Sequence, residues 1–158
     1  MGFGGGQWVD HINHAGSGIN ATATAQFAAD RAFETYHTFF DQVAVTNASI
    51  RDCYAGATRD YVDMQADQAA GRRIQMPTHV EYSHYNLVTL SGFEVGEVWA
   101  AYVDPAVKLS VEGVCCGQGH FIVELAPEET VGQLASFLDR LGVKSTREDA
   151  GAERRNEL

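Results

Sequence analysis

The chain has 158 residues and a formal net charge of −10, and 45% of its residues are hydrophobic. This length suffices for one well-buried core and is short for two, so a single domain is expected. The acidic balance disfavours direct binding to nucleic-acid phosphates, which depends on clustered Lys and Arg. No apolar run approaches the roughly 20 residues that cross a bilayer, so we expect neither a transmembrane helix nor a membrane partner.

Residues 1–20 are rich in glycine, which resists regular structure and favours a flexible or wrapping arm. Trp8 can anchor this arm to the body of the protein or to a neighbouring subunit. The segment lacks the basic start and apolar centre of a secretory signal peptide. The sequence therefore predicts a protein that stays in the cytoplasm or is assembled in a virion.

A helical region is predicted over residues 22–70, because apolar and aromatic residues recur there at alternating steps of four and three. Only Asn47 interrupts this stripe, and Gly71 stands where a left-handed C-terminal cap would end the helix. The stripe comprises Ala29, Phe33, Tyr36, Phe40, Val43, Asn47, Ile50, Tyr54, Ala57, Tyr61 and Met64.

Whether this region is one helix or a helical hairpin depends on residues 46–49. The unbroken spacing through Asn47 suits a continuous helix, in which a lone Asn can set the register of a coiled coil. Ser49 and Asp52 instead resemble a capping box that would begin a second helix. We expect a break or kink at residues 46–49. Apolar flanking residues such as Phe39 make the stripe too wide for a two-stranded coil, so a sheet or several helices should cover it.

After Pro77, β-branched and aromatic residues punctuated by glycine predict strands near 79–90, 93–103, 107–114 and 120–125. The short connections between them imply an antiparallel arrangement. A helix is predicted over residues 126–141, with Pro127 at its first position and Gly142 after its last turn. Its apolar residues should cover the sheet: Val131, Leu134, Ala135, Leu138 and Leu141. The predicted fold is thus a single α+β domain over 21–143, followed by a flexible polar tail over 144–158.

The most suggestive chemical cluster is formed by Cys115, Cys116 and His120, which surround a glycine turn. Two thiols and an imidazole are zinc ligands, but adjacent residues of a strand point to opposite faces, and the usual two-residue spacing between paired cysteines is absent. Three cysteines, two of them adjacent, do not form a disulfide framework, so reduced thiols are expected. We therefore predict neither a metal nor another cofactor, and keep these three residues as weak metal candidates.

An acid–base site would require charged side chains from several predicted strands to converge, namely Glu94, Glu97, Glu112, His84 and His120. Such residues more commonly lie on the solvated face of an antiparallel sheet. Because the common nucleotide-binding and hydrolase motifs are also absent, the sequence favours a protein that is not an enzyme.

Two segments resemble known groups of proteins in composition. The Ala-, Asp- and Tyr-rich stretch from Ala25 to Ala70 looks like the helices of proteins exported by actinobacterial type VII systems, although Trp8 is followed by Val9-Asp10 instead of completing the Trp-x-Gly turn. The glycine-rich start before an Ala-, Thr- and Gln-rich helix is similar to small phage virion proteins. Neither segment carries a motif that assigns a family.

Three functions follow from these features. The leading one is protein–protein interaction or assembly, with itself or another protein as partner, as in a viral structural component or a small acidic inhibitor. The second is an acidic nucleic-acid mimic that blocks a basic surface on its target, and the third is a metal- or thiol-dependent enzyme centred on the Cys115/Cys116/His120 region. The interface candidates are Phe33, Tyr36, Phe40, Asn47, Tyr54, Tyr61 and Trp8.

Overall fold

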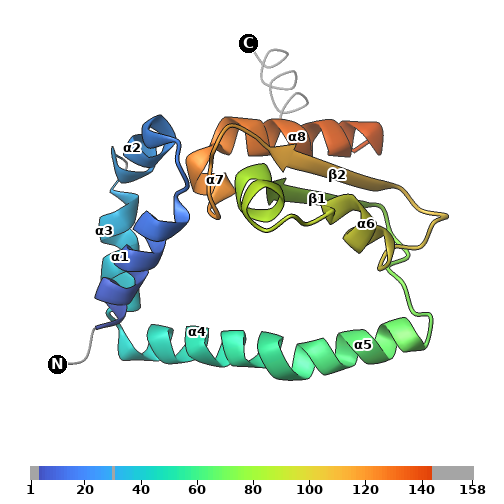
Figure 1. Cartoon of the computed structure of the whole chain (residues 1–158), viewed down its shortest axis with the longest axis horizontal. Helices are drawn as coiled ribbons and strands as arrows, with labels where there is room; N and C mark the ends of the chain where they lie inside the picture. Colours follow the sequence, from blue (N-terminus) through green and yellow to red (C-terminus); the bar gives the residue numbers. More distant parts are fainter. Residues whose placement is uncertain (1–3, 30, 144–158) are drawn as a thin grey trace, which may run out of the picture.

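A computed structural model of the chain describes residues 4–29 and 31–143, and the tail predicted for 144–158 lies outside these residues. Figure 1 shows three groups of elements: short helices at one end, a long helix along one side, and a unit of helices around two strands opposite it. The predicted fold, with its four-stranded antiparallel sheet, is wrong. The described residues are mostly helical, and their only sheet has two parallel strands.

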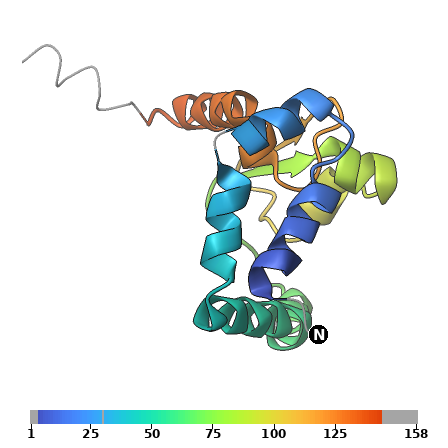
Figure 2. The ribbon, with the colours of Figure 1, turned by 90° about the vertical axis from the view of Figure 1, so that its left-hand side faces the viewer.

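The first group consists of α1 (Gly5–Gly16), α2 (Ala21–Ala29) and α3 (Ala32–Phe40). Most of the expected glycine-rich arm is therefore helical, and Figure 2 shows α1 beside α3 above one end of the long helix. Glycine permits this contact, because a Cβ atom at Gly5 would lie 2.1 Å from the carbonyl oxygen of Phe40. A small core joins α2 to helix α7 (Ile122–Leu125) through buried Ala23, Phe27 and Leu125.

The long helix (residues 43–69) comprises α4 (Val43–Ala55), the π-helical turn η1 (Gly56–Asp60) and α5 (Tyr61–Ala69). The break expected at residues 46–49 is absent, and the chain is interrupted at Asp41 and Gln42 instead. Ser49 does not cap a helix, since its hydroxyl donates to the carbonyl oxygen of Val45 at 3.1 Å within α4. The helix ends before Gly71, whose φ of 69° agrees with the predicted left-handed cap.

The sheet pairs β1 (Thr78–Ser83) with β2 (Leu109–Val114) in parallel, with Val80 opposite Val111. The connection contains the π-helix η2 (His84–Leu90) and α6 (Val95–Ala100), in place of the expected hairpin and second strand. Ser83 starts η2, because its hydroxyl accepts a hydrogen bond from the Asn86 amide at 2.9 Å. The fourth expected strand, near 120–125, is helix α7.

The C-terminal helix is present as α8 (Pro127–Arg140), with Pro127 in its first turn as predicted. The face assigned to the sheet is wrong, because Val131 and Leu134 are exposed whereas Thr130 and Phe137 are buried. The sheet explains the difference: β1 presents the His79 ring, which stacks on Phe137 with a centroid distance of 5.0 Å. Most of the periodic apolar face of α8 therefore lies on the surface, and only its Leu138 is half-buried.

A seam of two glycine-containing loops joins the first three helices to the β-strand unit. The amides of Gly119 and His120 donate to the carbonyl oxygens of Ser17 and Gly16, at 3.0 and 2.7 Å. In return, the amides of Ile19 and Asn20 donate to the carbonyl oxygen of Gly117. Ser83 in β1 also donates to the carbonyl oxygen of Gln118, at 2.7 Å. This seam positions the first three helices relative to the sheet.

Candidate functional site

The most unusual surface of the molecule is the long helix, none of whose residues is fully buried. Its closest packing is with α3 and along its own length, and it makes no extensive contact with the sheet or α6 in the described part of the chain. In Figure 1 it runs apart from β1 and β2. We define the exposed helix set as its exposed large apolar residues: Val43, Ile50, Tyr54, Tyr61, Val62 and Met64.

The predicted stripe divides at the break before Val43. On α3, Phe33 and Tyr36 are partly buried against the Ala23–Phe27–Leu125 core, and Phe40 lies 6.1 Å from the half-exposed Trp8 ring. Asn47 is exposed on α4. The stripe is thus partly core and partly free surface. The spacing of apolar residues does not distinguish the buried part of the stripe from the exposed part, because it does not indicate which part another helix or strand covers.

The π-helical turn changes the direction of the apolar side chains along the long helix. Such a turn inserts about one extra residue, and each residue of a helix rotates the side-chain direction by roughly 100°. The apolar side chains before and after this turn therefore do not follow one straight line along the helix. The regular spacing of apolar residues in the sequence gives no indication of this turn.

A cleft of about 690 Å³ lies between α5 and α6. Met64 and Ile74 contribute apolar surface to it, and Trp99 and Tyr102 line the α6 side, with ring centroids 6.3 Å apart. The charged residues at its rim are largely engaged: Arg72 pairs with Asp67, and Arg73 donates to the carbonyl oxygen of Ala101 at 2.8 Å. The cleft is therefore an apolar continuation of the exposed helix set.

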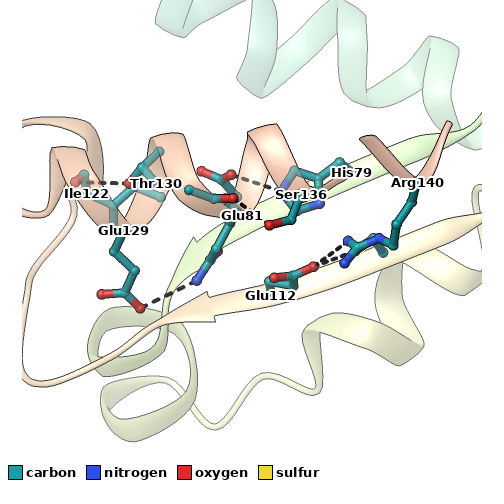
Figure 3. A network of polar contacts seen from close by, with 11 residues as sticks. His79, Glu81, Glu112, Ile122, Glu129, Thr130, Ser136 and Arg140 are labelled. Carbon is teal, nitrogen blue, oxygen red and sulfur yellow. Dashed lines mark hydrogen bonds and ion pairs between the residues drawn. The ribbon is translucent and has the colours of Figure 1, made fainter. Parts of the chain in front are cut away.

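A polar cluster lies between the sheet and α8, and its His79 and Glu81 side chains are largely buried (Figure 3). His79 Nε2 is 2.8 Å from the Glu81 carboxylate, and their side chains are 7% and 12% exposed. Beside them, Arg140 donates to Glu112 at 2.9 Å. Hydrogen bonds from the Ser110 hydroxyl and then from Arg140 hold the pKa of the Glu112 carboxyl below its usual range. The cluster ties α8 to both strands, and its residues do not line the cleft between α5 and α6.

The acid–base set expected from sequence does not converge. Only Glu112 belongs to the polar cluster, whereas His84, Glu94, Glu97 and His120 are exposed on other elements. His79 and Glu81 were missed, although their alternate positions on one strand place both side chains on the same face. Finding the cluster required the register of β1 against β2, which sequence spacing does not supply.

The Cys115/Cys116/His120 region contains a disulfide bond between the two adjacent cysteines instead of the expected reduced thiols. Both cysteines are exposed, and Cys116 has a φ of 72° in the left-handed region. His120 is exposed beside the ring of Phe121. Within residues 4–29 and 31–143, no three His, Cys, Asp or Glu side chains are placed to share a metal ion.

Two contacts link α3 to its neighbours through ionisable groups. The Tyr36 hydroxyl donates to Glu124 of α7, and this bond, together with burial, raises the pKa of Tyr36 to about 12. His37 Nδ1 lies 2.7 Å from the Asp10 carboxylate of α1, a hydrogen bond that raises the pKa of His37. Tyr36 thus ties α3 to α7, and His37 ties α3 to α1.

Comparison with known proteins adds no relative, since the sequence matches no protein-family model and no curated protein. The helices that the structure describes include none that is long and apolar enough to span a membrane.

Proposed function

We propose that this chain is a non-enzymatic assembly protein that associates with a second copy of itself through the exposed helix set. One observation carries the proposal: residues 43–69 form a helix of about 40 Å without a single buried residue. A helix in a soluble protein gains most of its stability by packing an apolar face against another element. The large side chains of this helix have no such partner within the described chain.

Burial of the exposed helix set would supply a substantial driving force. Covering one large apolar side chain contributes about 1.5–3 kcal/mol, so several such residues can offset the cost of association. Tyr54 and Tyr61, which are 71% and 51% exposed, combine a broad apolar ring with a polar end. This combination is typical of interface residues.

The charges on the long helix favour another copy over a basic partner. The net charge of the chain would make two copies repel, but Arg59 pairs with Asp63 at 2.6 Å and Arg72 pairs with Asp67 just beyond the helix. These pairs neutralise two carboxylates beside the apolar residues. Two of the four carboxylates on the long helix are paired in this way, so its charges favour self-association more than a role as a nucleic-acid mimic.

Sedimentation equilibrium tests the proposal. We expect the weight-average mass to rise above 17.2 kDa with increasing concentration. Tyr54→Asp should shift the equilibrium strongly towards monomer, because a buried unpaired charge is costly at an interface. Leu90→Asp is the matched control, since Leu90 is also exposed, at 61%, but lies on η2 away from the long helix.

Two results would overturn self-association. One is a wild-type protein that stays monomeric over roughly a hundredfold range of concentration. The other is an equal loss of association in Tyr54→Asp and Leu90→Asp, which would place the contact elsewhere.

A further inference from the structure

We propose that Cys115 and Cys116 form a reducible disulfide site whose oxidation state controls the seam between the first three helices and the β-strand unit. The disulfide joins adjacent residues immediately after β2 and at the start of the loop that docks on residues 16–20. The compound that reacts at this site is a dithiol reductant, either a small molecule or a protein. The proposal is independent of the assembly function.

The position of the bond argues against a role in global stability. A disulfide stabilises a fold mainly by closing a long loop of the unfolded chain, and this one closes no intervening residues at all. Its effect must therefore be local. Both residues are also exposed, and exposed disulfides are more accessible to an attacking thiolate than buried ones.

The disulfide affects the hydrogen bonds of the seam. The Cys116 carbonyl oxygen accepts a hydrogen bond from the Asn20 side-chain amide at 3.2 Å. The next carbonyl oxygen, that of Gly117, accepts from the Ile19 and Asn20 backbone amides at 2.9 and 3.2 Å. These acceptors are held while Cys116 keeps its left-handed backbone, a conformation unfavourable for a residue with a side chain. The disulfide constrains the backbone at this point.

The reaction is ordinary thiol–disulfide exchange. A thiolate of the dithiol attacks one sulfur, the bond between Cys115 and Cys116 breaks, and the other cysteine leaves as a thiolate that takes up a proton. The second thiol of the reductant then attacks the mixed disulfide and releases the first cysteine. The protein gains two electrons and two protons, and the reductant becomes a disulfide. The freed Cys116 can then leave the left-handed conformation and withdraw the acceptors from residues 19 and 20.

The test combines thiol titration with hydrogen exchange on the full chain. The oxidised protein should titrate one thiol, that of Cys53, and the protein reduced by dithiothreitol should titrate three. Reduction should accelerate amide exchange at Ile19, Asn20, Gly119 and His120 by roughly tenfold or more. The amides that pair β1 with β2 serve as an internal reference and should not change.

Variants separate the disulfide from other effects of the reductant. The double variant Cys115→Ser/Cys116→Ser should show fast exchange at the seam without reductant and no response when it is added. Cys53→Ser, the matched control, should respond like the wild type. The proposal fails if three thiols titrate in air-oxidised protein, or if seam exchange is the same before and after reduction.

Discussion

Gly119 shows how a single residue determines the docking of the first three helices on the β-strand unit. It is buried in the seam, and a Cβ atom there would lie 1.9 Å from the Gly16 carbonyl oxygen, a separation that the backbone cannot accommodate. Gly119→Ala should therefore lower the free energy of unfolding by about 2 kcal/mol. Urea denaturation measures the change.

Gly132→Ala is the control for this substitution. Gly132 is exposed on α8 with nothing within 4 Å of an added Cβ atom, so alanine should stabilise the protein by about 0.5–1 kcal/mol. Equal effects at the two glycines would contradict the close contact assigned to Gly119.

His37 makes the docking of α1 on α3 dependent on pH. The Asp10 carboxylate favours the protonated imidazole and raises the His37 pKa above its unfolded value of about 6.5. The contribution to stability is therefore complete below about pH 6.5 and is lost as the pH rises through the higher folded pKa. Urea midpoints across this window should fall with pH in the wild type, and less steeply in His37→Gln. His11→Gln, at an exposed position of α1, should retain the wild-type slope.

At the scale of elements, Ser49 and Ser83 test where helices begin. Ser49 lies inside α4, so Ser49→Ala should leave stability unchanged or raise it by about 0.5 kcal/mol, because alanine is the better helix former. Ser83 is a buried cap that also donates to Gln118, and Ser83→Ala should cost about 1–3 kcal/mol. Thermal unfolding measures both. A cost at Ser49 similar to that at Ser83 would restore the break expected at residues 46–49.

The elements that sequence predicted best are those with local end signals. Pro127 marked the start of α8, and Gly71 marked the end of the long helix. The strand predictions failed where apolar residues also recur with the period of a helix. In the segment predicted as the second strand, apolar residues recur at three- and four-residue steps, as a helix requires: Val95, Val98, Trp99 and Tyr102. These residues also favour a strand, because they are β-branched or aromatic.

The candidate site was predicted only in part for a related reason. The stripe does contain an exposed surface, from Val43 onwards, but Phe33 and Tyr36 pack on the core next to Phe27. On α8, the apolar period indicated Val131 and Leu134, whereas the stack of His79 on Phe137 determined the buried face. In both helices, amphipathic spacing identified apolar faces, and tertiary contacts decided which residues they bury.

At the scale of the whole molecule, the fold is an open arrangement in which one side, the long helix, has no extensive packing along its middle against the other elements that the structure describes. Figure 1 shows this helix connected to α3 at one end and to the chain leading into β1 at the other. Such a helix should be the least protected of the longer elements in a monomer, because its hydrogen bonds are exposed and few apolar contacts cover them. Any partner that covers it adds stability to the complete fold.

The apparent stability of the protein should therefore depend on its concentration. Association through the exposed helix set stabilises the folded state by mass action, so the thermal midpoint should rise as the protein is concentrated. Tyr54→Asp should remove this dependence while leaving the midpoint of the dilute protein nearly unchanged, because Tyr54 is 71% exposed and contributes little to packing within one copy. Differential scanning calorimetry at several concentrations provides the measurement, with Leu90→Asp expected to behave like the wild type. A midpoint that is independent of concentration in all three proteins would show that the long helix is stable without a second copy.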